Sequence, residues 1–318
     1  MRTIITVCSV LIWSMVGADS YPSRPIRFIN PTAPGGTAEP VARVLAQRMS
    51  EILGQTVVVD SRGGAGGTMG TLTAARAPAD GYTVLLGIVS PMAINVSLYG
   101  AQLPYNPLRD FAPISLITRI PQMLTVHPGV PAQNIKELIA LAKDPKHTFN
   151  YGSAGSGTTG HLVGELLNKT AGIQVTHIPF KGSGPALAAA LSGQVAYFMS
   201  GPPAVIGLAQ SGRLRPLAGS GVKRSPSLPD VPTFIESGLA IDITAWYCVV
   251  VPARTPQAIV TRLNAAVVES LRSAQVGETL LKMGAPPEPT TTAELRQFLV
   301  NEVQKFAVVV KLSGAKID

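Results

Sequence analysis

The chain has 318 residues, which is enough for two domains of ordinary size. Hydrophobic residues make up 46% of it and charged residues 14%, with 31 Gly and 27 Pro, so a disordered chain is excluded and a globular, loop-rich one is indicated. The formal charge of +8 comes from scattered Lys and Arg without interleaved aromatic residues, a pattern that argues against nucleic-acid binding and favours long-range attraction of anions.

Residues 1–20 have the pattern of a secretory signal peptide. Arg2 supplies the positive region, residues 4–16 form an apolar stretch, and cleavage after Ala18 or after Ser20 is predicted. A membrane anchor is the alternative, but the apolar stretch is shorter than the roughly 20 residues that a span needs. We therefore expect an exported protein.

The two cysteines of the chain are Cys8, in the leader, and Cys248. Removal of the leader leaves Cys248 without a partner, so no internal disulfide is expected. Cys248 lies in the apolar run 247–251, which predicts a buried, small hydrophobic side chain.

From Tyr21 onward, strand-like and helix-like segments alternate. The expected elements are a strand at 24–29, a helix between Thr37 and Gly54, a strand at 57–60, a short helix that ends near Ala75 and a strand at 83–86. This βαβαβ order predicts a parallel sheet with helices on its faces.

A second α/β series follows two strand-like pieces, 111–119 and 123–127, which are separated by Pro121 at the first crossing between domains. Its expected elements are helices at 134–143, 161–170, 185–191 and 205–210 and strands at 149–152, 175–179, 195–199 and 213–218. The Pro-rich segment 225–233 is interpreted as the return linker. One more strand and two long helices follow, with apolar faces at 259–271 and 295–310, and both helices are expected to pack on the first domain. We thus expect domain 1 at 21–120 plus 240–318 and domain 2 at 121–239.

Two strand-to-helix loops, 34–39 and 152–161, are candidates for ligand binding. Glycines let a ligand approach main-chain N–H groups, and the positive end of a helix dipole stabilises an anion there. The hydroxyls of Ser153, Ser156, Thr158 and Thr159 add donors. The same residue types are also ordinary helix caps and turn formers. One such loop in each expected domain favours an anion site in a cleft between the two.

Two side chains in these loops have more than one interpretation. Glu39 opens the first helix, where an acid suits the dipole, but it could also accept a hydrogen bond from a ligand. His161 lies in the first turn of a later helix and could cap it, contact a ligand or act as a base, with capping favoured.

Enzymatic alternatives depend mainly on the segment Gly155–Gly160, which fits G-x-G-x-x-G between a strand and a helix. That motif requires an acid about twenty residues later, and residues 177–182 contain none, although Lys181 could meet a 2′-phosphate. An exported NADP-dependent oxidoreductase, or a hydrolase that uses Ser153 or Ser156, is kept as the alternative. No cofactor is expected, and the dispersed histidines predict no metal site.

Ordered segments across nearly the whole mature chain resemble one family. They are Pro34-Gly35-Gly36, Gly63-Gly64-Ala65-Gly66-Gly67, Asp80-Gly81-Tyr82-Thr83, Asp110-Phe111-Ala112-Pro113, Asn150-Tyr151-Gly152-Ser153-Ala154-Gly155, Pro179-Phe180-Lys181-Gly182 and Leu228-Pro229-Asp230-Val231-Pro232-Thr233. Together they resemble the substrate-binding proteins of the tripartite tricarboxylate transporter family, also called Bug proteins.

The resemblance implies a type II periplasmic binding-protein fold of two α/β domains that close on a ligand in the cleft between them. It implies a small organic carboxylate as the ligand, either a di- or tricarboxylate or an aromatic acid, with membrane transporter subunits or a sensor domain as further partners. A monomer that acts as a binding protein, and not as an enzyme, is expected. The expected ligand-binding residues are Pro34, Gly35, Gly36, Thr37, Glu39, Ser90, Ser153, Ala154, Gly155, Ser156, Thr158, Thr159, Phe180, Lys181 and Ser200.

Two residues depart from the family pattern. Glu39 stands where family members usually carry Asp, and Ser200 stands where many carry an acid. Loss of a negative charge near the pocket should either favour a more anionic ligand or remove a partner for an amino group. We therefore predict a carboxylate ligand without an ammonium group.

Overall fold

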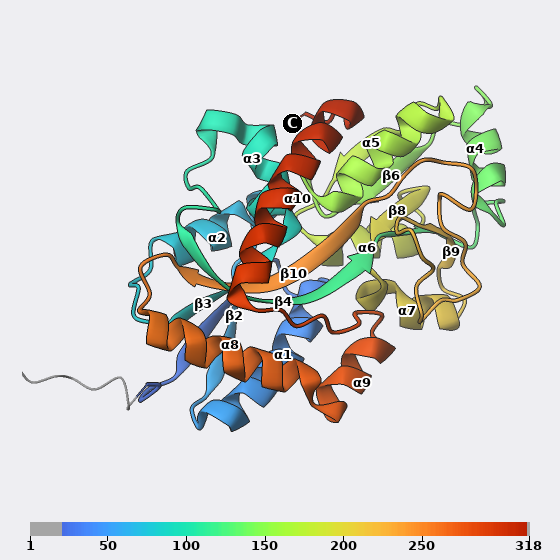
Figure 1. Cartoon of the computed structure of the whole chain (residues 1–318). Helices are drawn as coiled ribbons and strands as arrows, with labels where there is room; N and C mark the ends of the chain where they lie inside the picture. The colour runs from blue at the N-terminus through green and yellow to red at the C-terminus, as the bar shows by residue number, and fades with distance from the viewer. Residues whose placement is uncertain (1–20, 317–318) are drawn as a thin grey trace, which may run out of the picture.

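The computed structural model describes residues 21–316, which form two five-stranded sheets with helices packed against them (Figure 1). The expected signal peptide, with its cleavage site, lies outside the described residues. Within the described part, no helix is both long and apolar enough to cross a membrane.

The first sheet and its helices, here called lobe 1, have the strand order β2-β1-β3-β10-β4. The strands are β1 (Ile26–Asn30), β2 (Val57–Ser61), β3 (Thr83–Ile88), β4 (Phe111–Pro121) and β10 (Thr244–Pro252). The first three are parallel, as the βαβαβ order predicts, whereas β10 runs antiparallel to both β3 and β4. The late strand β10 therefore lies between two strands from the first half of the chain.

Helix α1 (Ala38–Leu53) shows why the sequence folds locally as expected. Its apolar residues Val41, Leu45 and Met49 recur at helical spacing and are buried. The helix ends at Gly54, whose φ of 67° is a left-handed conformation that glycine adopts without a steric cost.

The other helices of lobe 1 come from both ends of the chain. They are α2 (Thr68–Ala75), the π-helical turn η3 (Ser90–Ile94), α3 (Asn95–Tyr99), α8 (Gln257–Arg272), α9 (Ala274–Lys282) and α10 (Thr292–Ser313), with the short 3-10 turns η2 (Ala65–Gly67) and η4 (Gly100–Gln102). The sequence analysis expected neither α9 nor the helical segment that follows Ser90.

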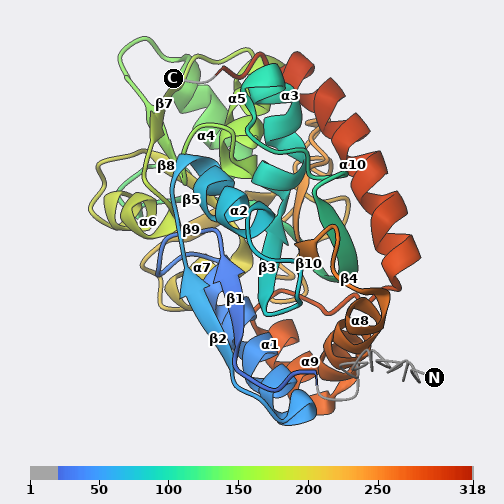
Figure 2. The same ribbon diagram turned by 90° about the vertical axis from the view of Figure 1, so that its left-hand side faces the viewer.

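The second sheet and its helices, here called lobe 2, have the strand order β7-β6-β8-β5-β9. The strands are β5 (Met123–Val126), β6 (Asn150–Ser153), β7 (Thr176–Pro179), β8 (Tyr197–Ser200) and β9 (Arg215–Gly219), and the helices are α4 (Ile135–Lys143), α5 (Thr159–Ala171), α6 (Ser183–Leu191) and α7 (Pro202–Gln210). Helix α5 begins two residues earlier than expected. Figures 1 and 2 show this sheet beside the first one.

The chain crosses between the lobes twice, and the two crossings are hydrogen-bonded to each other. On the way out, β4 runs to Pro121 and Gln122 leads into β5; on the return, Ser220 leads toward β10. The backbone N–H of Gln122 donates to Ser220 Oγ at 2.8 Å, and Ser220 Oγ donates to the carbonyl of Ile243. The buried Ser220 therefore joins both crossings.

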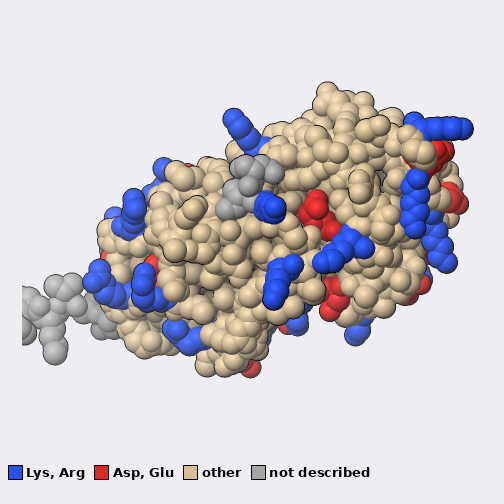
Figure 3. Space-filling view, turned by 90° about the horizontal axis from the view of Figure 1, so that it is seen from above, with Lys and Arg blue, Asp and Glu red and all other residues tan. Residues whose placement is uncertain are grey.

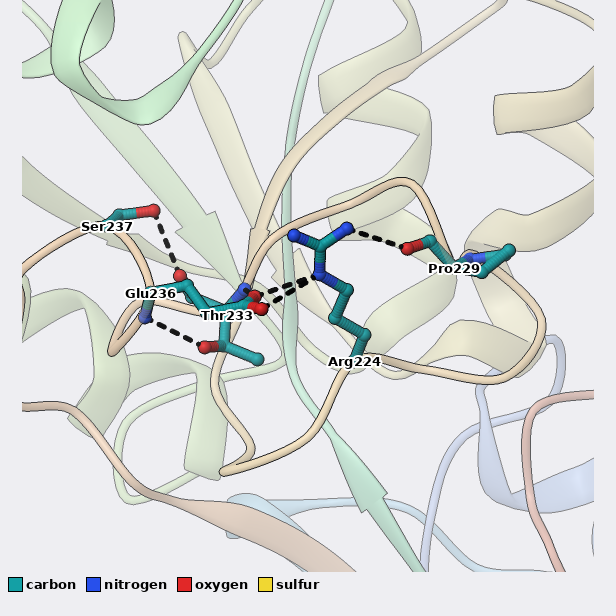
Figure 4. A network of polar contacts seen from close by, with 5 residues as sticks. All are labelled: Arg224, Pro229, Thr233, Glu236 and Ser237. Carbon is teal, nitrogen blue, oxygen red and sulfur yellow. Dashed lines mark hydrogen bonds and ion pairs between the residues drawn. The ribbon is translucent and has the colours of Figure 1, made fainter.

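A polar network holds the return segment in shape (Figure 4). Arg224 Nε contacts both carboxylate oxygens of Glu236 at 3.0 Å, and its Nη1 donates to the carbonyl of Pro229. Glu236 also accepts the backbone N–H of Thr233 and donates its own N–H to Thr233 Oγ1. These bonds order a segment that has no regular secondary structure of its own.

The final helix packs on lobe 1, as the sequence analysis expected, and it also reaches lobe 2. Helix α10 contacts η3, α3 and β4, and it also lies against α5 of lobe 2 (Figure 1). Lys169 Nζ, on α5, donates to the carbonyl of Leu312 at 2.9 Å. The additional contact with lobe 2 was not predicted, and it follows from the length of this 22-residue helix.

Candidate ligand-binding site

A cavity of about 680 Å³ lies between the two lobes. It is lined by Pro31 to Pro34 and Thr37, Gly63 to Gly67, Ile88 to Ser90, Ala154 to Ser156, Thr158 to Gly160 and Pro179 to Ser183, together with Tyr99, Gln122, Met199, Ser200, Ala245 and Tyr247. Most of these residues lie in loops at the carboxyl ends of strands, the usual place for ligands in open α/β sheets. The volume falls within the range of small-molecule sites.

The start of α5 gives the cavity its main set of anion-binding groups. Thr158 is the N-cap: its Oγ1 accepts the backbone N–H of His161 and donates to the carbonyl of Gly155 at 2.7 Å. Thr159 and Gly160 follow in the first turn and line the cavity, where their N–H groups have no acceptor within the helix. These amides and the helix dipole favour a negatively charged ligand group.

The side chain of His161 stabilises the loop that precedes α5. Its ring is buried, and its Nδ1 accepts the backbone N–H of Gly157 at 3.2 Å. The ring also stacks on that of His177, with centroids 4.1 Å apart. His161 does not line the cavity, so capping of the loop is the role that the structure supports for it.

Two roles were expected for Glu39, a structural one at the start of α1 and a ligand-binding one, and the structure supports the first. Its Oε2 accepts the backbone N–H of Gly35 at 2.8 Å, and its Oε1 pairs with Arg43. The Gly35 hydrogen bond, helped by Arg43, lowers the pKa of this carboxyl below its ordinary value. Glu39 does not line the cavity. The side chain of Glu is longer than that of Asp, and it extends back to the Gly35 N–H of the loop.

Eleven of the fifteen expected site residues line the cavity and four do not. The lining ones are Pro34, Thr37, Ser90, Ala154, Gly155, Ser156, Thr158, Thr159, Phe180, Lys181 and Ser200, and the others are Gly35, Gly36, Glu39 and Ser153. Ser153 is fully buried beneath the loop, where its Oγ bonds with Gly155 N–H at 3.1 Å and His177 Nε2 at 2.6 Å. Its hydroxyl therefore fixes the loop and is not exposed to a ligand in the cavity.

One whole wall of the cavity was missed by the sequence analysis. Residues Gly63 to Gly67 line it, and four in succession have positive φ, including Ala65 at 46°. Glycine takes this conformation readily, which explains the glycine-rich composition. The repeated glycines were the signal, but the sequence analysis did not include them among the expected ligand-binding residues.

The lobes touch around the cavity through glycines. A Cβ added at Gly157 would lie 2.8 Å from Asn95 Oδ1 and from Leu98 Cδ2 of lobe 1. A Cβ added at Gly182 would lie 3.0 Å from the side chain of Ala33. The two lobes are therefore in close contact beside the cavity, and this contact leaves little room for larger side chains.

Charge is almost absent from the lining. Lys181 carries the single charge among the described residues that line the cavity, and it is exposed. Elsewhere the bases are spread out: Figure 3 shows Lys and Arg in separate groups across the face seen from above, without one continuous patch. The described residues also contain no cluster of three His, Cys, Asp or Glu that could hold a metal ion.

Residues 41–314 match the family described as the tripartite tricarboxylate transporter family receptor. The chain belongs to this family. It is 38% identical over 315 residues to Protein BugT of Bordetella pertussis, a match that covers 98% of this chain and 96% of that protein.

Solved structures agree with this family. The chain is 33% identical to an R. palustris protein solved with adipate, with a TM-score of 0.90 and coverage of 94% of this chain and 100% of that one. It is 32% identical to MatC from Rhodopseudomonas palustris with bound malate, with a TM-score of 0.86 and coverage of 91% and 100%. The periplasmic binding-protein fold expected from the sequence is thereby confirmed.

Proposed function

We propose that this receptor captures a small organic carboxylate in the periplasm and presents it to the membrane subunits of a tripartite transporter or to a sensor domain. The observation that carries the proposal is the pair of first-turn amides, Thr159 and Gly160, at the cavity wall. Relatives of similar fold were solved with adipate and malate. The near-neutral lining supports binding through peptide dipoles, without an ion pair.

The ligand has no ammonium group in this proposal. An ammonium group needs a carboxylate or several acceptors once it leaves water, and no acidic residue lines the cavity. Ser200 occupies the cavity wall where many family members carry an acid. A panel in which only amino acids stabilise the protein would contradict this part of the proposal.

Closure between two domains, 21–120 plus 240–318 and 121–239, belongs to the same proposal, as does a monomeric receptor that does not turn its ligand over. The form of the hydrolase alternative that uses Ser153 has little support because its hydroxyl, although close to His177, is fully buried. Turnover of an ester panel by the purified protein would revive it.

Ligand binding should raise thermal stability. A ligand that binds only the folded protein adds about 2.7 kcal/mol to the free energy of unfolding at a hundredfold excess over Kd. We expect this from at least one di-, tri- or aromatic carboxylate, measured by thermal shift and confirmed by calorimetry. Failure of every carboxylate would overturn the proposed function.

The Thr159 amide offers a sharper test. Thr159→Pro removes that N–H at the first position of a helix, where proline is well tolerated, and Thr158 already has the extended backbone that precedes proline. Loss of a hydrogen bond to a charged group should weaken binding about 10- to 150-fold with little change in stability.

Thr159→Val is the matched control, because it keeps the N–H and removes only the hydroxyl. We expect calorimetry to show much weaker binding for the proline variant than for the valine variant. Equal Kd values for the two variants would show that the amide at position 159 does not hold the ligand.

A further inference from the structure

The end of the cavity nearest the lobe crossings, here called the crossing end, is formed by Thr37, Gln122, Ser200 and Tyr247. Ser200 pairs with Met123 between β8 and β5, which places it beside Gln122. A Cβ added at the neighbouring Gly201 would lie 3.1 Å from Thr37 Cγ2, so Ser200 approaches lobe 1 here. Both lobes contribute to this end.

Two polar side chains of the crossing end have no hydrogen-bond partner among residues 21–316. Ser200 is 3% exposed, and its Oγ is buried without a hydrogen bond to any described residue. The side-chain amide of Gln122 also makes no hydrogen bond within residues 21–316, although its backbone N–H does. Thr37, in contrast, is a hydrogen-bond partner of the Tyr247 phenol, whose pKa is raised by burial to about 12. Buried polar groups normally have hydrogen-bond partners, so the Ser200 hydroxyl indicates that a ligand group binds beside it.

The crossing end suits a neutral group of the ligand. The helix that follows Ser200, α7, begins with Pro202 and Pro203, which have no N–H to offer an anion. No charged side chain lines the crossing end, so a second carboxylate or an ammonium group would be buried there without a partner. The hydroxyl of Ser200 and the amide of Gln122 each donate and accept hydrogen bonds.

We propose that the ligand is a carboxylate whose far end carries a neutral hydrogen-bonding group, a hydroxyl or a carboxamide, bound by Ser200 and Gln122. This inference rests on the proposed function, because it assumes that the carboxylate occupies the amide-rich start of α5. It narrows the ligand class: simple diacids and amino acids fit the crossing end less well than hydroxy or carboxamide acids do.

Two matched ligand series test the inference on the purified protein. One is hexanoate with hydrogen, hydroxyl, carboxamide, carboxylate or ammonium at its sixth carbon; the other is benzoate with the same groups at the para position. In at least one series, calorimetry should show the hydroxyl or carboxamide ligand binding about three- to tenfold more tightly than the parent acid and than the diacid.

Two variants assign that preference to Ser200. Ser200→Ala should bring the hydroxyl and carboxamide ligands to within about twofold of the parent acid, whose Kd should not change. This variant removes an unpaired buried hydroxyl, so its thermal stability without ligand should be equal to that of the parent protein or higher. A lower thermal stability would reveal a folding defect. Ser200→Asp should shift the preference toward the ammonium ligand.

The inference is overturned if the diacid binds most tightly, or if the preference for the hydroxyl or carboxamide ligand survives Ser200→Ala. It is also overturned if neither series binds, and the wider carboxylate panel then decides the proposed function separately. A diacid or tricarboxylate that binds well in that panel would leave the function standing without the neutral end group.

Discussion

Glu302, on α10, is a partly buried carboxylate that serves packing and not ligand binding. Its Oε2 accepts the indole N–H of Trp246 at 2.6 Å, and burial raises its pKa above the ordinary value. Burial therefore outweighs the opposing effects of Lys305, Trp246 and Arg119. A carboxyl with a raised pKa stabilises the fold at low pH, where it is protonated, and that contribution is lost as the pH rises through the raised pKa.

Glu302→Gln keeps an acceptor for Trp246 and removes the charge. We expect urea unfolding to give a higher free energy of unfolding for this variant than for the parent at pH 8, and nearly equal values at pH 4. Glu278→Gln, at an exposed position of α9, is the control and should show no such difference. An equal effect of Glu302→Gln at both pH values would rule out the charge as its cause.

At the same scale, residue types were easier to predict from the sequence than side-chain directions. Thr158 and Thr159 could be chosen because hydroxyl residues beside glycines open a helix. Ser153 looked equivalent, yet it ends a strand and turns inward toward His177. The hydrogen-bond partners of Glu39 could not be predicted from the sequence either, because they depend on how the loop bends back.

At the scale of elements, contact between loops of the two lobes controls closure. Gly157, in the loop before α5, has a φ of 75° and faces Asn95 and Leu98 on α3. Gly157→Ala should weaken ligand binding by at least about tenfold, because its methyl group would hold the lobes apart.

Gly172→Ala is the matched control for that variant. Gly172 has a similar φ of 63°, but a Cβ there meets nothing within 4 Å. Both variants should lose a similar amount of stability through backbone strain, about 1 kcal/mol, and only Gly157→Ala should lose affinity by calorimetry. Equal affinity losses in both would remove the contact with α3 as the cause.

Long elements with clear periodicity, such as α1 and α8, were predicted well, because a repeating buried face can be recognised from the local sequence. Helix α9 was missed because its nine residues bury only Val276 and Leu280, too few for a periodic signal. The π-helical turn after Ser90 lacks any distinctive pattern and depends on the packing of α10 against it.

For the whole molecule, stability depends on how the crossings are joined. Ser220→Ala would leave the N–H of Gln122 and the carbonyl of Ile243 without their shared partner in a buried place. The expected loss in the free energy of unfolding is about 1–3 kcal/mol. Ser211→Ala, which removes an exposed hydroxyl bonded within α7, should lose less in the same urea titration.

The two α/β series and the position of the first crossing could be predicted from the order of the segments. The insertion of β10 between β3 and β4 could not, because that pairing joins residues more than a hundred positions apart and leaves no local pattern. The same reason explains why the contact of α10 with lobe 2 was not predicted. Long-range contacts also determine the crossing end, where Gln122 and Tyr247 meet residues of distant segments.

Cys248 lies at the centre of β10, and its thiol is fully buried against Gly87. Burial also raises its pKa, which further suppresses the reactive thiolate. Since this cysteine belongs to the sheet of lobe 1, its alkylation rate would follow the opening of that lobe alone. Comparison with the loss of fluorescence or circular dichroism would then reveal whether the two halves of the receptor melt together or in succession.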